Sequence, residues 1–295
     1  MRLLRFAHND GAMLRNDVLY LFLTIAILLL LSGCDSGTYS AEKRFWHASN
    51  AFNQLLKAPD KATPVDYQEI IDSFREITIR YPMWPNSAQA QFNIGQLYAM
   101  QGNFSKARDE FMVILKDYPA NVDMCGRSLF TVALVYERED NWPKAKETLD
   151  RIEKDYPDTG TAFQVPLHVA EYYKVKGQNA EADAAYLAAL DKYKNTIKDK
   201  SKTYGALVTV DLAVSCYSDQ EKWNEAVDYL GSLVVDYPET LLAPKAAFIQ
   251  AAIYEQKLNQ PGKARELYDE IIKKYSKTPF AKTAQQQIER LNKSK

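Results

Sequence analysis

The stretch QAQFNIGQLYAMQGNFSKARDEFMVILKDYP, residues 89–119, contains two helical patterns separated by a turn. The first pattern covers Gln89 to Met100 and is mostly apolar or small. Gly102 and Asn103 follow it, and both residue types are favoured in tight turns. The stretch therefore predicts two helices folded back on each other as a hairpin.

The second pattern shows which face of its helix is buried. Ala107, Phe111 and Ile114 recur at the spacing of one helix face. The small side chain of Ala107 allows close approach to the first helix. Tyr118 precedes Pro119, and a residue before proline is pushed out of the helical region. We therefore expect the second helix to end at Tyr118.

This hairpin pattern recurs along the chain. A tyrosine at the end of each unit recurs at positions 81, 118, 156, 193, 237 and 275. Eleven residues before five of these tyrosines lies an alanine, at positions 107, 145, 182, 226 and 264. A single hairpin cannot bury its own apolar face, so repeated hairpins are expected to stack and share a core.

The repeat register divides the chain into predicted segments. Residues 41–85 form an N-terminal helix pair, and residues 86–295 form five repeats with a C-terminal capping helix at Phe280–Leu291. The last tyrosine spacings include one of 44 residues, which places an insertion at Asn195–Lys202. We expect that insertion to be a longer surface loop, with a dedicated binding loop as the alternative.

Five positions of the first repeat carry a resemblance to a known family. Gly95, Tyr98, Ala107, Phe111 and Pro119 are spaced as in the tetratricopeptide signature, lengthened by about three residues per unit. The lengthened unit is similar to that of periplasmic lipoproteins in the group that includes BamD (YfiO) and YbgF. The resemblance implies an all-α fold, a right-handed superhelical solenoid of tetratricopeptide-like helix hairpins.

The N-terminal residues have the pattern of a lipoprotein signal peptide. Val18–Leu31 is a run of 14 residues that is apolar apart from Thr24, and it is short for a membrane span of about 20 residues. The tetrapeptide LSGC at residues 31–34 resembles the lipobox of bacterial lipoproteins. It implies cleavage after residue 33, acylation of Cys34 and a polar tether over residues 34–40. An uncleaved anchor is the alternative.

The membrane that holds the lipid anchor stays open at this point. Resemblance to the BamD group favours the periplasmic face of the outer membrane. In enterobacterial lipoproteins, however, an aspartate directly after the lipidated cysteine retains the protein at the inner membrane, and Asp35 occupies that position. Both locations place the mature chain in the cell envelope.

Composition and motifs argue against catalysis, metal binding and nucleic-acid binding. The formal net charge of −1 lacks the basic excess of a nucleic-acid-binding protein. His47 and His168 belong to distant hairpins, so no metal site is expected, and no catalytic or phosphate-binding motif is present. We predict a non-enzyme without a cofactor. Cys125 and Cys216 fall two repeats apart, which favours buried free thiols, with a disulfide between them as the alternative.

The resemblance also implies where partners bind. In tetratricopeptide solenoids the first helix of each repeat lines a concave groove that holds partner peptides. The candidate groove residues by this register are Phe92, Asn93, Gln96, Arg127, Phe130, Leu134, Leu167, His168, Glu171 and Phe248. The alternative for the apolar members is that they belong to the core between repeats.

The predicted function is that of a lipid-anchored scaffold for other envelope proteins. The BamD-like interpretation makes the partners β-barrel assembly machinery or its unfolded barrel clients. A YbgF-like coordinator of cell division, a pilotin-like chaperone of secretin subunits and a receptor for cell-wall fragments are the alternatives.

Overall fold

The computed structural model describes residues 37–293, and every element assigned within that range is a helix. The chain divides into two compact units, Met1–Pro119 and Ala120–Lys295. The predicted signal peptide, Cys34 and Asp35 lie outside the described residues. The all-α fold class predicted from the repeat pattern is confirmed.

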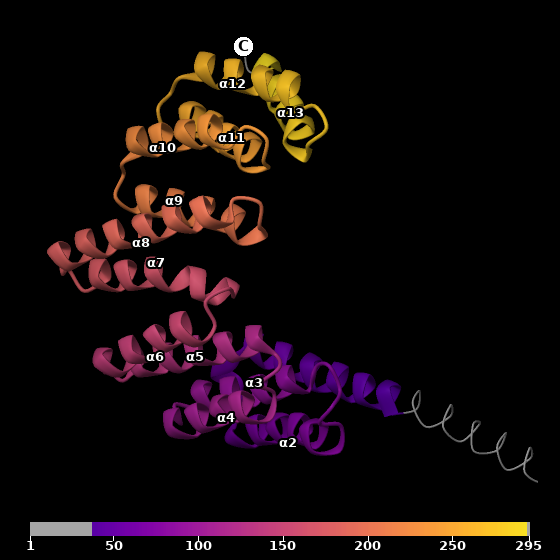
Figure 1. Ribbon diagram of the computed structural model, residues 1–295. Coiled ribbons are helices and arrows are strands. Elements are labelled where there is room, and N and C mark those ends of the chain that lie inside the picture. Colours follow the sequence, from indigo (N-terminus) through magenta and orange to yellow (C-terminus); the bar gives the residue numbers. More distant parts are fainter. Residues whose placement is uncertain (1–36, 294–295) are drawn as a thin grey trace, which may run out of the picture. The chain divides into compact units, whose positions relative to one another are not determined.

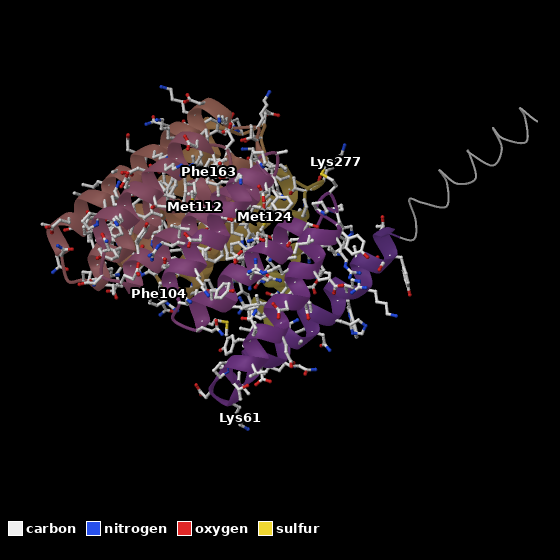
Figure 2. The ribbon with its side chains drawn as sticks, turned by 90° about the horizontal axis from the view of Figure 1, so that it is seen from below. Lys61, Phe104, Met112, Met124, Phe163 and Lys277 are labelled. Atoms are coloured by element: carbon white, nitrogen blue, oxygen red, sulfur yellow. The ribbon has the colours of Figure 1, made fainter. Side chains whose placement is uncertain are left out.

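The first unit contains a helix over residues 37–57 and three further α-helices. The short 3₁₀ helix η1 and the α-helices of this unit are η1 (Pro59–Lys61), α2 (Pro64–Arg80), α3 (Ser87–Met100) and α4 (Phe104–Asp117). Lys61 projects outward at the turn between the first helix and α2 (Figure 2). Thr63 and Asp66 begin α2 with a reciprocal capping box, which satisfies two backbone N–H groups.

The first helix begins earlier than predicted. Residues 37–40 are already helical, so the polar tether predicted over residues 34–40 is wrong for its last four positions. Ser40 accepts a hydrogen bond of 2.9 Å from the hydroxyl of Tyr81 at the end of α2. This contact joins the start of the described chain to the first hairpin.

Aromatic rings fill the core of the first unit. The ring centroids of Phe45 and Phe74 lie 5.9 Å apart in an edge-to-face arrangement, and Phe52 contacts Phe74 in the same way at 6.2 Å. Gly95 on α3 faces Phe111 on α4, and a Cβ atom at Gly95 would lie 2.6 Å from the Phe111 ring. Gly95 thus lets α3 and α4 pack closely, and Ala107, the predicted small contact residue of α4, is fully buried.

The second unit continues as successive helix hairpins and one closing helix (Figure 1). Its helices are α5 (Val122–Arg138), α6 (Trp142–Asp155), α7 (Gly160–Val175), α8 (Asn179–Lys200), α9 (Tyr204–Asp219), α10 (Trp223–Asp236), α11 (Leu242–Gln256), α12 (Pro261–Lys274) and α13 (Pro279–Lys293). The helix α13 agrees with the predicted capping helix at Phe280–Leu291.

Tyrosine ends most of the second helices, as predicted. Tyr118, Tyr156, Tyr237 and Tyr275 are the C-caps of α4, α6, α10 and α12, with φ between −119° and −135°. Tyr275 takes this conformation although Ser276 follows it. A helix can therefore end at the repeat tyrosine without a proline after it.

The helix α8 departs from this rule and corrects a prediction. It continues past Tyr193 to Lys200, so Asn195–Lys202 is mostly helix rather than a surface loop. Tyr193 is fully buried and Ile197 is 1% exposed. Ile197 packs into the core, and this tertiary packing stabilises the helical turns that follow Tyr193.

The two cysteines of the described chain behave as predicted. Cys125 and Cys216 are both buried, and neither forms a disulfide. Burial raises the pKa of both thiols because it disfavours the charged thiolate, and the pKa of Cys216 rises to about 12. Such thiols are poor nucleophiles at neutral pH.

Candidate protein-binding face

The first helices of the second unit pack in sequence, α5 beside α7, α7 beside α9 and α9 beside α11. Side chains from these helices form a surface that we call the first-helix face. Its residues are Arg127, Phe130, Leu134, Glu137, Gln164, His168, Glu171, Lys174, Asp211, Asp219 and Lys245. Charged groups of both signs and half-buried apolar groups share this face.

His168 joins α7 to α5 at the centre of the face. Its Nε2 atom lies 2.7 Å from the Oε1 atom of Glu137. The imidazole ring also meets Phe130, with centroids 4.9 Å apart at an interplanar angle of 62°. One side chain therefore makes a polar and an aromatic contact to the neighbouring repeat.

Polar contacts also join α7 to α9 and α9 to α11. The ammonium of Lys174 donates to the backbone carbonyl of Asp219, whose carboxylate accepts from the Tyr186 hydroxyl at 3.1 Å. Lys245 pairs with Asp211 at 2.6 Å and donates to the backbone carbonyl of Leu207 at 2.8 Å. Each neighbouring pair of first helices is therefore fixed by at least one side chain that crosses between them.

Glu171 lies between these contacts, and its environment favours the protonated form. Partial burial of its carboxyl raises the pKa of Glu171, and the charge of Asp219 raises it further. His168 and Lys174 act in the opposite direction but do not reverse the shift. The carboxyl of Glu171 therefore takes up a proton at higher pH than an ordinary glutamate.

The structure places five of the predicted groove residues on this face. Arg127 and Glu171 are exposed, while Phe130, Leu134 and His168 are half-buried. Their helices α5 and α7 pack against each other. These five side chains are the part of the predicted groove that the structure assembles.

Other predicted groove residues belong to the core and are corrected here. Phe92 is 1% exposed and packs against Phe111 at a centroid distance of 5.1 Å, and Asn93 is 6% exposed. Leu167 is 8% exposed and joins the large core cluster of the second unit. The apolar stripe of each first helix is wide enough that these positions turn toward the packed helices.

Two further predicted groove residues have intermediate positions. Gln96 is half-buried on α3, in the first unit. Phe248 is half-buried on α11, where its ring lies 5.6 Å from Tyr268 and 6.2 Å from Phe280. These contacts make Phe248 mainly a packing residue of the C-terminal helices.

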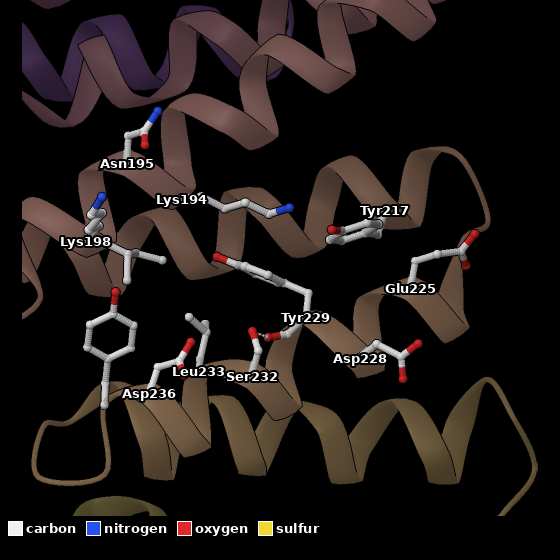
Figure 3. A pocket seen from close by; sticks show the side chains of 12 residues that line it. Lys194, Asn195, Lys198, Tyr217, Glu225, Asp228, Tyr229, Ser232, Leu233 and Asp236 are labelled. Atoms are coloured by element: carbon white, nitrogen blue, oxygen red, sulfur yellow. Dashed lines mark hydrogen bonds between the residues drawn. The ribbon is translucent and has the colours of Figure 1, made fainter.

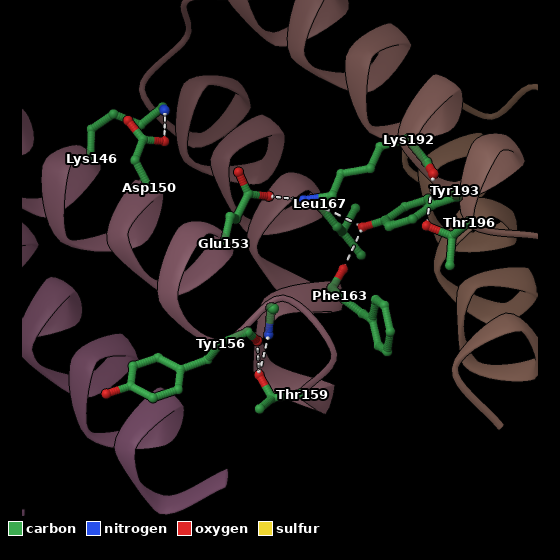
Figure 4. Close-up of polar contacts among 11 residues, drawn as sticks. Lys146, Asp150, Glu153, Tyr156, Thr159, Phe163, Leu167, Lys192, Tyr193 and Thr196 are labelled. Atoms are coloured by element: carbon green, nitrogen blue, oxygen red, sulfur yellow. Dashed lines mark hydrogen bonds and ion pairs between the residues drawn. The ribbon is translucent and has the colours of Figure 1, made fainter. Parts of the chain in front are cut away.

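Tyr193 of α8 bridges two backbone groups of α7, a contact that the sequence did not predict. We call this contact the tyrosine bridge. The backbone N–H of Leu167 donates to the Tyr193 hydroxyl at 3.2 Å, and this hydroxyl donates to the carbonyl of Phe163 at 2.9 Å (Figure 4). The hydroxyl thus replaces the direct bond between residues four apart, next to Pro166, which lacks a backbone N–H. His168 follows this bridge directly, so Tyr193 supports the turn that carries it.

The sequence contained a signal for this bridge. Pro166 lies inside a predicted helix, and Tyr193 is a repeat tyrosine that neither precedes proline nor keeps the usual spacing to the next one. Together they mark an exceptional hairpin, but only the fold shows that the two features meet.

Within residues 37–293, no group of histidine, cysteine and acidic side chains is arranged to hold a metal ion. None of the helices in that range combines the length and apolar character that a membrane crossing requires.

Four segments of the sequence match the family model of the tetratricopeptide repeat, at residues 89–121, 127–159, 212–240 and 245–278. The chain therefore contains tetratricopeptide repeats. These segments leave out residues 160–211, which include the bridged helix α7 and the extended helix α8. No curated protein matches the sequence.

Three solved structures resemble the chain at low identity. A tetratricopeptide repeat protein from Parabacteroides merdae ATCC 43184 is 14% identical with a TM-score of 0.36, over 80% of each chain. BtubC (BKLC) from P. vanneervenii is 14% identical with a TM-score of 0.39, over 72% of this chain and 89% of its own. Yeast Tom70 is 16% identical with a TM-score of 0.45, and the match covers 82% of this chain but only 47% of Tom70.

Proposed function

We propose that this chain is a scaffold that binds protein partners on its first-helix face, anchored to the bacterial envelope through Cys34. Tetratricopeptide arrays are built to present such extended faces to other proteins. The single observation that carries the proposal is the assembled cluster of Arg127, Phe130, Leu134, His168 and Glu171. It combines half-buried apolar side chains with exposed charges.

The cluster suits an extended or helical segment of a partner protein. Phe130 and Leu134 offer apolar area that is only half covered within the chain. Arg127 and Glu171 supply opposite charges beside it, which favour one orientation of the bound segment. Partner segments with an apolar anchor flanked by charged residues are the expected ligands.

The more specific proposal is a role in outer-membrane protein assembly. It is supported by the LSGC sequence at residues 31–34 and by the resemblance of the lengthened repeats to the BamD group. The partners are then β-barrel assembly proteins or unfolded barrel clients. Asp35 favours the inner membrane instead, where cell-division, secretion or wall-synthesis proteins become the expected partners.

Site-specific photocrosslinking in living cells tests both levels of this proposal. A photoreactive residue replaces Gln164, which is exposed one helical turn before His168, and a matched control replaces the exposed Asp183 on α8. We expect crosslinks to β-barrel assembly proteins or barrel clients from position 164 only, in outer-membrane fractions. Inner-membrane partners at position 164 would replace the specific proposal. Equal or absent crosslinking at both positions would contradict the first-helix face as the binding surface.

A further inference from the structure

The N-terminal helix, residues 37–57, exposes large aromatic side chains to solvent. Tyr39 is 68% exposed and Trp46 is 62% exposed, whereas the other three tryptophans of the chain are half-buried. Tyr39, Lys43 and Trp46 follow one another at helical spacing, so they share one side of the helix. We call these three side chains the aromatic face.

The aromatic face lies opposite the side of the helix that packs into the first unit. Ala41, Ala48 and Phe52 are buried on that inner side. Turning Trp46 inward would therefore expose these residues, so the core of the unit cannot take up its ring. The Trp46 ring meets only the edge of the ring beside it, that of His47, at a centroid distance of 4.8 Å among the described residues.

A third apolar side chain lies beside the start of this helix. Met83 is 93% exposed in the loop between α2 and α3. The Tyr81 hydroxyl donates to Ser40 at 2.9 Å. The Trp84 ring meets the ring of Phe45 at a centroid distance of 5.3 Å. Because Met83 lies between two residues that touch the N-terminal helix, the loop holds it near the aromatic face.

The charged groups near this face have an excess of positive charge. Lys43 is exposed between the two aromatic residues, and Glu42 is the one acid among residues 37–47. Arg44 and Arg80 both pair with Glu76, at 2.8 Å and 3.1 Å, so one carboxylate serves two guanidinium groups. Exposed aromatic rings beside positive charge suit the headgroup layer of an anionic membrane.

The open cavity between α8 and α10 shows what an ordinary hollow of this chain contains. It measures about 540 Å³, and its lining includes Lys194, Lys198, Asp228 and Asp236, all exposed (Figure 3). Water solvates such charges without a ligand. The aromatic face instead leaves a large apolar area in water, which is typical of surfaces that contact another phase or molecule.

The position of Cys34 indicates which occupant covers the aromatic face. Cys34 and Tyr39 are five positions apart in the sequence, a stretch that spans about 18 Å at most. The lipid proposed at Cys34 therefore keeps the start of the N-terminal helix within reach of the bilayer surface. Tryptophan and tyrosine are enriched at that depth, because the ring is apolar and its N–H or O–H group stays hydrated.

We propose that the aromatic face and Met83 form a membrane-contact surface beside the lipid anchor. Tyr39, Trp46 and Met83 enter the boundary between headgroups and acyl chains, and Lys43 meets the phosphates of anionic lipids. This second contact sets the N-terminal helix against the bilayer instead of leaving the first unit free to turn on its tether. The placement of this surface at a bilayer rests on the lipid anchor of the proposed function, and the contact itself goes beyond it.

Quenching of tryptophan fluorescence tests the contact without natural lipidation. The chain from Cys34 onward, which contains every described residue, is coupled through that cysteine to a maleimide lipid. The vesicles contain phosphatidylcholine and phosphatidylglycerol with brominated acyl chains, and the buried Cys125 and Cys216 are protected from coupling. We expect bromine to quench part of the wild-type fluorescence, and Trp46→Phe to lose that part. No quenching, or quenching that Trp46→Phe fully retains, would overturn the proposal.

This design separates the contact from the anchor. The maleimide lipid replaces the natural one, so a protein that is never acylated in cells still gives a valid result here. Failure of the anchor itself appears only in the fractionation of a Cys34→Ser protein. Loss of bromine quenching with a correctly acylated protein in cells would leave the anchor intact and would refute the membrane-contact surface.

A matched variant moves the exposed indole to another helix of the same unit. Trp46→Phe combined with Asp109→Trp places a tryptophan at an exposed position of α4. We expect dissolved iodide to quench this indole and brominated lipid to leave it unaffected. Bromine quenching as strong as in the wild type would mean that tethering brings every surface to the lipid, which would refute the assignment of the aromatic face.

A pair of lysine variants tests the charge within the contact. Lys43→Gln and Lys116→Gln each remove one exposed lysine of the first unit. For Lys43→Gln, we expect the ratio of lipid-contacting to free chains, obtained from bromine quenching, to fall about fivefold. For Lys116→Gln the ratio should stay as in the wild type. An equal result for the two variants would contradict the role of Lys43 at the membrane.

Discussion

At the scale of single residues, the exceptional features of this chain concentrate on tyrosines of the second unit. The repeat tyrosine Tyr193 donates to Phe163 and accepts from Leu167 in the backbone of α7. Other repeat tyrosines, such as Tyr156, end their helices as C-caps. The same residue type at equivalent repeat positions therefore has different roles, set by the neighbouring backbone.

The first prediction concerns the tyrosine bridge. Tyr193→Phe leaves the N–H of Leu167 and the carbonyl of Phe163 without their partner, so the free energy of unfolding should fall by about 1–3 kcal/mol. Urea denaturation followed by circular dichroism measures this. Tyr204→Phe, at a position 81% exposed, is the control and should change nothing. A Tyr193→Phe protein as stable as the wild type would show that the bridge does not support α7.

The second prediction concerns alkaline stability. Burial raises the pKa of the Cys216 thiol from 9.0 to about 12. Between these pH values the unfolded chain loses the thiol proton before the folded chain does, so the stability from this group is lost as pH rises from 9 to 12. Cys216→Ala should therefore flatten the decline of the free energy of unfolding over that window.

The comparison for this measurement is Cys125→Ala, because the pKa of Cys125 is raised less. Both variants remove one buried thiol and leave every tyrosine in place. Urea denaturation at several pH values from 8 to 12 gives the slopes. Identical slopes for wild type and Cys216→Ala would contradict the role assigned to this thiol.

At the scale of helices, packing between the two members of a hairpin depends on small residues at the contact. Gly95 faces the ring of Phe111 so closely that any side chain there forces the ring to move. Ala145 holds a fully buried position on α6, which packs against α5. In α8 a large side chain has the stabilising role instead, because Ile197 is buried and its packing stabilises the last turns of the helix.

The third prediction tests the small contact on α6. Ala145→Trp overpacks the interface between α5 and α6 and should lower the free energy of unfolding by about 1–3 kcal/mol or more. Ala184→Trp, at an exposed position on α8, is the matched control and should have little effect. Thermal unfolding measures both variants. An Ala145→Trp protein that melts like the wild type would refute the repeat register.

The fourth prediction separates a helical from a looped end of α8. Ile197→Ala removes a side chain that is 1% exposed and should cost about 2–5 kcal/mol of unfolding free energy. If residues 195–202 formed a surface loop, the same substitution would cost almost nothing. Asp199→Ala, an exposed neighbour in the same turns, is the control for local helix propensity.

At the scale of the whole molecule, the chain consists of two compact units that each pack helices of the same repeat pattern. A stacked repeat obtains part of its core from its neighbours, so stability is shared along each unit. The proposed function adds a membrane anchor at Cys34 to this array. Such an anchor keeps a binding face at a surface without a membrane-spanning helix.

The fifth prediction tests the anchor. Cys34→Ser removes the thiol that lipidation requires, so the protein should move from the membrane fraction to the soluble fraction of the envelope or remain as an uncleaved precursor. Fractionation followed by immunoblotting and mass determination measures this, with Cys125→Ser as the control. A Cys34→Ser protein with unchanged mass and location would exclude lipidation at this residue.

The sequence by itself determined the repeat, the all-α class and the helix ends at the repeat tyrosines other than Tyr193. Positions such as Ala107 and Tyr118 act through local spacing and helix ends, which depend on neighbouring residues in the chain. Tertiary structure alone decided which side chains the core leaves accessible. Phe92 and Phe130 look alike in the repeat pattern, yet the first is buried and the second meets His168 on the face.

The same distinction applies to α8 and its cavity. The sequence showed a longer spacing after Tyr193 but not its conformation, because a polar segment containing one isoleucine suits a loop or a helix equally well. Contacts between residues far apart in the chain settled the choice, with Tyr193 reaching Phe163 and Ile197 entering the core. Only packing at that range brings the α8 lysines opposite the α10 carboxylates, since no local spacing encodes their meeting.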